Sequence, residues 1–259
     1  MSWELAGRKC TSRLLIGTGK LATYTLIPGM MAQSGVEVLT VAVRRMNPSS
    51  AVENILQHIP PDAVIMVNTS GARNSKEAVK IALAGREITG SNWIKVEIET
   101  DSKYLLPDNE ATIQASAALV REGCAVFAYI SPDLVTARKL EQVGVAAVMP
   151  LAALIGTNKG ITCETLLRPI IEEIGVPVII DAGIGRPSHA AHAMELGADA
   201  VLISTAIAVA RDPIAMTVAM ARAVEAGRLA YEQGLPVEHD RARASSPLTG
   251  FLKSMPHDQ

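Results

Sequence analysis

The sequence has few aromatic residues, and neither sign of charge is concentrated in it. Phe, Trp and Tyr make up 3% of the 259 residues, although 49% of the chain is hydrophobic. A core must therefore be built from Val, Ile, Leu, Ala and Met, which suits strands that are buried on both faces. The formal net charge is −2, and no stretch gathers Lys and Arg into a long basic face. A nucleic-acid partner is therefore not expected.

Long apolar runs and paired cysteines are also missing. No stretch approaches the roughly 18 apolar residues of a membrane span, so no membrane partner is expected. Cys10, Cys124 and Cys163 stand far apart and form no CxxC pair, which favours three free thiols over a metal or redox site. The N-terminal segment MSWELAGRKC does not have the apolar run of a signal peptide. We therefore expect a cytoplasmic protein.

The sequence does contain a short apolar run followed by an amphipathic stretch, repeated eight times. The predicted strands cover residues 14–16, 36–43, 63–68, 93–99, 124–130, 146–150, 176–182 and 198–204. The predicted helices cover residues 24–33, 48–57, 75–86, 109–121, 133–142, 163–174, 187–196 and 213–233. Alternating strands and helices with short connections predict a parallel sheet. Eight units favour closure into a (β/α)8 TIM barrel over a doubly wound sheet.

The residues between these segments agree with this pattern. A glycine that can adopt the left-handed helix C-cap precedes several predicted strands, at Gly35, Gly123, Gly144, Gly175 and Gly197. Ser75 and Pro187 mark helix starts, as a cap residue and a first-turn proline respectively. No linker interrupts the repeat, so residues 1–235 are predicted to form one barrel domain. Residues 236–259 lose the periodicity and are predicted to be a flexible tail.

The fourth predicted strand carries three ionisable residues on one face. Because side chains alternate along a strand, Lys95, Glu97 and Glu99 point to one side and the apolar residues between them to the other. The apolar side should pack under helices, which places the charged side inside the barrel. An amine nucleophile beside a carboxylate explains this pattern, and a buried structural Lys–Glu pair is the alternative. Burial lowers the pKa of lysine and a carboxylate raises it, and the sequence leaves that balance open.

The later strands point to the same end of the barrel. Active sites of such barrels lie at the C-terminal ends of the strands, and phosphate groups often bind the loops after strands seven and eight. The seventh predicted strand contains Asp181, a candidate acid or base whose alternative role is a turn carboxylate. Gly183 and Gly185 follow, and their backbone can approach a ligand closely. Ser204–Thr205 end the eighth strand, and Gly156 lies in the loop after the sixth.

Other segments match known motifs only in part. Gly17–Lys20 lacks the spacing of a P-loop, because position 14 is Leu where that motif requires Gly. Gly183–Gly185 lacks the third glycine of a dinucleotide fingerprint. His189 and His192 stand three residues apart on a predicted helix, which favours a helix face in contact with solvent over a zinc pair, so no metal is expected. Arg44–Arg45 end the second strand, where contact with an anion or with solvent fits equally well.

Eight short segments, taken in chain order, make a combination that covers nearly the whole chain: 12–20, 40–45, 92–97, 105–108, 148–151, 181–185, 194–202 and 244–247. This combination resembles the thiazole synthase family of bacterial thiamine biosynthesis. Glycine-rich pieces recur in many barrels, but the ordered set is specific. The family usually has Gly-Ser-Pro at Ala152–Leu154 and Asn-Thr at Ser204–Thr205. Ser204 keeps a hydroxyl that can donate to a phosphate.

The resemblance implies a role for each matching residue. Lys95 corresponds to the lysine that forms a Schiff base with 1-deoxy-D-xylulose 5-phosphate, and Glu97 and Asp181 to carboxylates that move protons during tautomerisation and ring closure. The positions that bind the sugar phosphate correspond to Gly156, Ala182, Gly183, Ser204 and Thr205. The resemblance also implies sulfur delivery by the C-terminal thiocarboxylate of a small sulfur-carrier protein, dehydroglycine as a second substrate, a homotetramer, and no cofactor.

Two other interpretations of these residues stay open. A strand lysine and a phosphate loop also occur in other imine-forming barrels that bind sugar phosphates, such as aldolases and pyridoxal-phosphate synthase-like proteins. The second interpretation is a non-catalytic barrel scaffold. The presence of Lys95, Glu97 and Asp181 together argues against a scaffold, because buried charges are costly without a function.

Overall fold

The structure is a computed structural model that describes residues 2–43, 46 and 54–246. Its main element is a parallel sheet. The strands are β3 (Leu14–Gly17), β4 (Val38–Ala42), β5 (Val64–Asn68), β6 (Trp93–Val96), β7 (Ala125–Ile130), β8 (Ala147–Pro150), β9 (Ile179–Asp181) and β10 (Ala200–Ile203). Each predicted strand coincides with one of these, and the ends differ by at most three residues.

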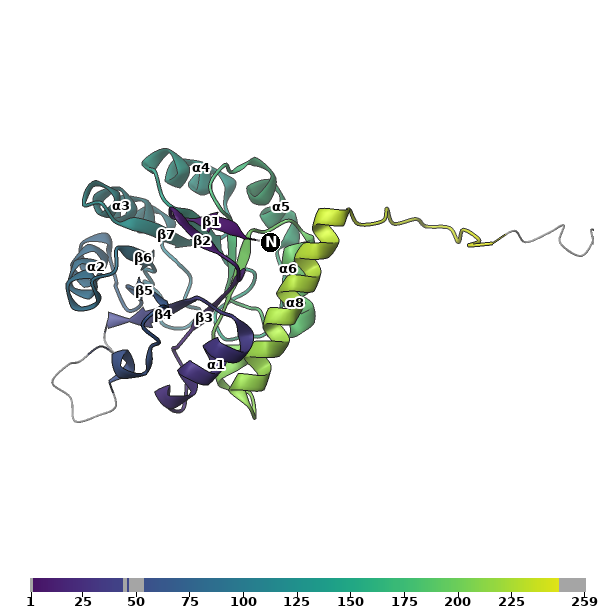
Figure 1. Cartoon of the computed structure of the whole chain (residues 1–259). Helices are drawn as coiled ribbons and strands as arrows, with labels where there is room; N and C mark the ends of the chain where they lie inside the picture. Colours follow the sequence, from purple (N-terminus) through teal and green to yellow (C-terminus); the bar gives the residue numbers. More distant parts are fainter. Residues whose placement is uncertain (1, 44–45, 47–53, 247–259) are drawn as a thin grey trace, which may run out of the picture.

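The sheet closes on itself. The strands follow the order β8-β7-β6-β5-β4-β3-β10-β9. Parallel bridges between Val148 and Val178 and between Leu151 and Asp181 join the last strand to the first. Helices surround the ring on its outside (Figure 1). The predicted (β/α)8 barrel is therefore confirmed.

The helices fill the connections between the strands. The α-helices are α1 (Ile27–Ser34), α2 (Ser75–Thr89), α3 (Asn109–Arg121), α4 (Leu134–Val143), α5 (Glu164–Glu173), α6 (Pro187–Glu195), α7 (Thr205–Ala208) and α8 (Pro213–Gln233). Short 3-10 helices add η1 (Tyr24–Leu26) and η3 (Ile55–His58). Most of the predicted helix 48–57 lies outside the described residues, as does Arg44–Arg45. The described end of that predicted helix forms the 3-10 helix η3.

Two predictions about helix ends were wrong. The N-cap of α2 is Asn74, whose side chain accepts a hydrogen bond from the Glu77 amide, and Ser75 is the first helical residue. Gly175 does not adopt the left-handed conformation that the other predicted glycine caps adopt. Its amide donates to Glu141 Oε1 at 2.6 Å, so a side chain of α4 stabilises the turn after α5.

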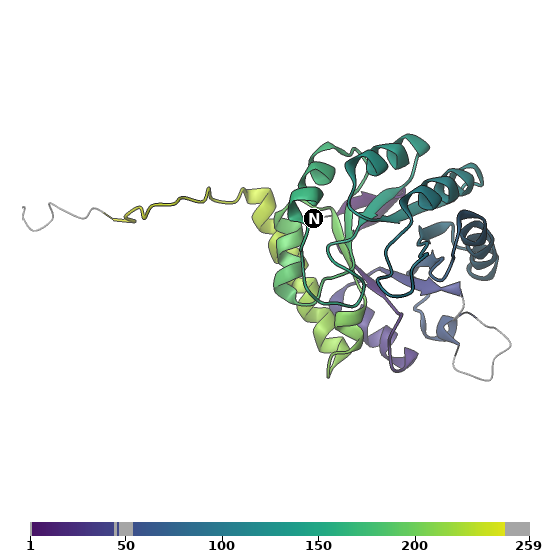
Figure 2. The same cartoon turned by 180° about the vertical axis from the view of Figure 1, so that it is seen from behind.

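An N-terminal hairpin, which the sequence pattern did not predict, lies at one end of the barrel. The strands β1 (Trp3–Leu5) and β2 (Arg8–Cys10) pair antiparallel around a left-handed turn at Ala6 and Gly7. Leu5 and Cys10 are fully buried in the cluster of side chains that fills the ring. The hairpin lies in front of the ring of strands in Figure 1 and behind it in Figure 2, which shows the barrel from the opposite side.

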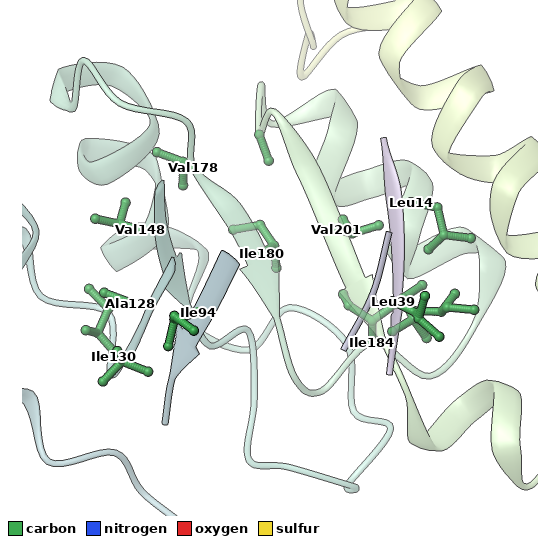
Figure 3. Close-up of a cluster of buried hydrophobic side chains, with 14 of the residues drawn as sticks. Leu14, Leu39, Ile94, Ala128, Ile130, Val148, Val178, Ile180, Ile184 and Val201 are labelled. Atoms are coloured by element: carbon green, nitrogen blue, oxygen red, sulfur yellow. The ribbon is translucent and has the colours of Figure 1, made fainter. Parts of the chain in front are cut away.

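The period-two alternation of the strands separates two hydrophobic clusters. Residues between the strands and the helices, such as Leu14, Ile94, Val148 and Val201, form the outer cluster (Figure 3). Their neighbours on the opposite strand face form the inner cluster, which includes Leu15, Met66, Phe127, Met149, Ile179 and Leu202. Apolar residues thus fill the inside of the ring toward the hairpin, and the polar inward-facing residues lie at the other end.

The chain beyond α8 has no helix or strand among its described residues. Residues 235–246 are exposed and extend away from the barrel in both views (Figure 1, Figure 2). The division into a barrel domain and a flexible tail stays a prediction. In the described part of the chain, no helix is long and apolar enough to cross a membrane.

Candidate active site

A cavity of about 340 Å³ opens at the C-terminal ends of the barrel strands. Its walls come from strand ends and from the loops that follow them, as the barrel fold predicts. All eight candidate residues selected from the sequence line it: Lys95, Glu97, Gly156, Asp181, Ala182, Gly183, Ser204 and Thr205. The structure therefore brings together residues that are far apart in the chain.

Lys95 points into the barrel. Its strand neighbours Ile94 and Val96 belong to the outer cluster, so alternation turns the lysine to the inside. Only 4% of Lys95 is exposed. Beneath it lies the ring of Tyr129, whose centroid is 4.9 Å from Lys95 Nζ. The predicted inward orientation of Lys95 is thus what the structure has.

Two buried carboxylates contact the lysine amine. Lys95 Nζ lies 2.5 Å from Asp181 Oδ2 and 2.9 Å from Glu97 Oε2, and both carboxylates are almost fully buried. Burial alone lowers the pKa of Lys95, but the charges of Asp181 and Glu97 outweigh it, and the pKa is raised above its ordinary value. The balance that the sequence left open is therefore decided in favour of an ammonium ion.

Glu97 is held as a carboxylate by several donors. Burial raises its pKa, but the charge of Lys95, the Glu99 side chain and the Asn68 amide lower it, and the pKa falls to about 2. Asn68 Nδ2 donates to Glu97 Oε2 at 3.0 Å.

The predicted strand 93–99 was too long, because β6 ends at Val96. Beyond it the Glu97 amide donates to Thr69 Oγ1 at 2.9 Å, so a side chain takes the place of the regular ladder.

Asp181 is oriented by an unusual backbone turn. Ala182 adopts φ 55°, the left-handed region that a residue with a side chain rarely occupies. In this conformation the Ala182 amide donates to Asp181 Oδ1 at 2.6 Å, while Oδ2 contacts Lys95. Burial raises the pKa of Asp181 despite the nearby lysine charge. Asp181 is thus the carboxyl better suited to take and return a proton.

The glycines allow two loops to meet beside the cavity. A Cβ atom on Gly183 would lie 2.6 Å from both the Cβ and the amide nitrogen of Ala153. Among the described residues, the amides of Gly156 and Gly183 donate to no other protein group. The hydroxyls of Ser204 and Thr205 also line this part of the cavity. Free amides and hydroxyls suit a phosphate, whereas the Ala182 amide is already occupied by Asp181.

The sequence pattern did not select two residues of this site. Asn68 orients Glu97, and Tyr129 lies beneath the lysine. The period-two rule already predicts that Asn68 faces inward, because Val64 and Met66 belong to the inner cluster. Tyr129 resembles an ordinary aromatic core residue in the sequence, so only its position in the structure distinguishes it.

The histidines of α6 have partners other than a metal. His189 Nδ1 accepts a hydrogen bond from the Gly185 amide at 3.2 Å. His192 Nε2 lies 3.2 Å from Glu164 Oε2. Within the described ranges, no group of three or more metal-ligating side chains gathers at one place. The Gly185 amide is therefore not free to bind a ligand, unlike that of Gly183.

The fold and the site define a class of protein. It is a parallel (β/α)8 barrel with an amine between two carboxylates at the C-terminal end of the strands and free backbone amides beside them. This combination suits an enzyme that forms an imine with a carbonyl compound carrying an anionic group.

Comparison with known proteins narrows the class to one family. Residues 4–247 match the family model described as Thiazole biosynthesis protein ThiG. A thiazole synthase of Desulforamulus reducens is 55% identical over 97% of this chain and 98% of its own length. That of Pelotomaculum thermopropionicum is 53% identical over the same shares. The chain therefore belongs to the ThiG family of thiazole synthases.

A solved structure agrees with this assignment. The crystal structure of the Amycolatopsis orientalis BexX/CysO complex contains a chain that is 32% identical and superposes with a TM-score of 0.80. The match covers 92% of this chain and 98% of that one. A phosphoribosyl anthranilate isomerase from Thermus thermophilus, 14% identical with a TM-score of 0.56, shares the fold alone.

Proposed function

We propose that this thiazole synthase holds 1-deoxy-D-xylulose 5-phosphate as an imine on Lys95. The observation that supports this most directly is the position of Lys95 Nζ, between Asp181 and Glu97 at the bottom of a cavity lined by free amides and hydroxyls. The Lys95 amine and the amides and hydroxyls that can donate hydrogen bonds to a phosphate lie at the same end of the barrel. One extended sugar phosphate can therefore reach both.

Because the two carboxylates have different environments, we assign them different roles in the proton transfers. Lys95 rests as an ammonium ion and must lose a proton before it attacks a carbonyl carbon. Asp181, whose pKa is raised, accepts that proton over 2.5 Å and delivers it to the carbonyl oxygen as the carbinolamine forms. The same carboxylate then takes a second proton from the carbinolamine nitrogen and passes it to the hydroxyl, which leaves as water. The products are an iminium ion and the regenerated carboxylate, so charge and protons balance. Glu97 stays ionised and stabilises the iminium charge.

The later steps need a sulfur donor and a second substrate that supplies carbon and nitrogen. We assign the sulfur to a small sulfur-carrier protein with a C-terminal thiocarboxylate, and the remaining atoms to dehydroglycine. The relative BexX was crystallised in a complex with CysO, which supports a protein partner for this chain. The homotetramer and the cytoplasmic location stay predictions.

Reductive trapping tests the imine. Borohydride added with the pentulose phosphate should convert the imine to a stable amine and add the mass of the sugar phosphate, less one oxygen atom, to the protein. Mass spectrometry should find this adduct on Lys95. Lys139→Ala removes an exposed lysine on α4 and should leave trapping unchanged. Undiminished labelling of Lys95→Ala would disprove the assignment.

A product assay separates the alternatives. A thiazole synthase forms the thiazole phosphate only when both the thiocarboxylated carrier and dehydroglycine are present. An aldolase or a pyridoxal-phosphate synthase-like enzyme would trap the sugar but would not need the carrier. A scaffold would trap nothing.

A further inference from the structure

One lysine at the cavity has no role in the imine chemistry. Lys20 follows β3 and lines the cavity with its exposed side chain. Within the part of the chain that the structure describes, it makes no hydrogen bond or ion pair. A Cβ atom built on Gly156 would lie 3.4 Å from Lys20 Nζ and 3.7 Å from Thr205 Oγ1. The space beside Gly156 is thus bordered by an ammonium group and a hydroxyl.

The loop that carries Lys20 is held firmly against the end of β10. A Cβ atom on Gly17 would lie 2.5 Å from the Ser204 Cβ, so only glycine allows this approach. Thr18, almost fully buried, donates from Oγ1 to the Thr40 carbonyl at 2.8 Å. These two contacts fix the backbone just before Lys20, whose amine lies beside Gly156.

The charges that line the cavity explain why a second lysine is needed. Its described lining contains two lysines and three carboxylates, which is one more negative than positive charge. Lys95 is already paired with Asp181 and Glu97. A phosphate dianion entering this cavity is repelled by the carboxylates, and in the described lining only Lys20 is free to offset that repulsion.

We propose that Lys20 binds the phosphate group of the substrate and selects phosphorylated over unphosphorylated ketoses. Its ammonium group, the Thr205 hydroxyl and the amides of Gly156 and Gly183 would surround the phosphate oxygens. Charge-assisted hydrogen bonds from an ammonium group are stronger than those from neutral donors. The proposal rests on the sugar-phosphate substrate proposed above, and it adds the residue that discriminates for the phosphate.

The test compares two sugars in the same trapping assay. For Lys20→Ala, the concentration of the pentulose phosphate that gives half-maximal trapping should rise about tenfold or more, because a hydrogen bond to a charged group is lost. The maximal extent of trapping should stay the same. With unphosphorylated 1-deoxy-D-xylulose, Lys20→Ala and the unaltered protein should behave alike. Lys20→Arg should restore part of the affinity.

The matched control is Lys159→Ala, which removes an exposed lysine of the neighbouring loop that does not line the cavity. It should leave both titrations unchanged. Equal half-maximal concentrations for Lys20→Ala and the unaltered protein would overturn the inference. So would an equal loss with both sugars, because that indicates a general disturbance of the site.

Inorganic phosphate gives a reading that does not depend on imine formation. Calorimetric titration should show weaker phosphate binding to Lys20→Ala than to the unaltered protein or to Lys159→Ala. If the unaltered protein traps no sugar, the proposed function fails, and the phosphate titration still decides the role of Lys20. Equal phosphate affinity in all three proteins would contradict that role.

Discussion

At the residue scale, the central feature is one amine shared by two buried carboxylates. Lys95, Glu97 and Asp181 are each at most 5% exposed, so none of them can be charged without a partner. The two carboxyl groups nevertheless differ in pKa. Hydrogen bonds from neighbouring side chains and the charge of Lys95 lower the pKa of Glu97, whereas for Asp181 the interaction with Lys95 does not offset the effect of burial, and its pKa is raised. Two carboxyl groups with different proton affinities beside one amine suit the successive proton transfers of imine formation.

The first prediction concerns the pH dependence of trapping. Glu97→Gln removes one of the charges that raise the pKa of Lys95, so this pKa should fall. Because the neutral amine forms the imine, the midpoint of trapping against pH should move to lower pH by about one unit or more. Cyanoborohydride trapping across a pH series measures this midpoint.

The control for this series is Glu172→Gln, which changes an exposed glutamate of α5 by the same substitution. It should leave the midpoint where it is in the unaltered protein. An unshifted midpoint in Glu97→Gln would mean that Glu97 does not set the pKa of Lys95.

At the scale of elements, the loop after β9 is shaped by its contact with the loop after β8. Ala182 and Gly183 are consecutive left-handed residues, with φ 55° and 75°. Gly183 lies against Ala153, and a Cβ atom on Gly185 would lie 2.4 Å from the Asn158 Cβ. The close approach of these loops explains why glycine alternates with other residues here, and it positions Asp181 and the Gly183 amide together.

A pair of substitutions separates this contact from backbone strain. Gly183→Ala and Gly123→Ala place alanine at the same φ of 75°, but a Cβ atom on Gly123 meets nothing within 4 Å. Both should lose about 1 kcal/mol of unfolding free energy through strain. Gly183→Ala should lose about 1–3 kcal/mol more, because its methyl group overlaps Ala153. Urea unfolding measures both losses, and equal losses would mean that the loops are not in tight contact.

At the scale of the whole molecule, the barrel is completed by its first and last segments. The N-terminal hairpin buries Leu5 and Cys10 in the inner cluster at the end away from the cavity. The last helix, α8, packs on α6, where a Cβ atom on Gly227 would lie 2.3 Å from the Ala191 carbonyl oxygen. The described residues after 234 are exposed and add no such contact.

Truncation tests where the folded unit ends. A chain that stops after residue 235 should unfold within about 2 °C of the full chain, because it loses less than about 1 kcal/mol of stabilising contacts. It should also trap the sugar phosphate normally. A chain that stops after Ala223 loses the buried Val224 and the contact of Gly227 with Ala191, and it should not unfold cooperatively. Calorimetry and trapping measure both chains, and a large loss in the longer chain would show that the tail belongs to the fold.

Much of this architecture follows from local rules that act within a few residues. Alternation predicted that Lys95 points inward, because Ile94 and Val96 are apolar and a strand has period two. The glycine caps and the apolar runs located α3 and α8 with the bounds that the structure has. The hairpin was missed because the segments on either side of Ala6 and Gly7 are too short for a periodic signal.

What the sequence by itself determined is the order of strands and helices, the inward face of each strand, and the candidate residues at the strand ends. Only the tertiary structure decided that Asp181 reaches Lys95, which carboxyl group has the raised pKa, that the Ala182 amide is occupied, and that Lys20 lies beside Gly156. These depend on the register with which the ring closes and on the dielectric environment inside it. Both are properties of residues distant in the chain, so no local pattern encodes them.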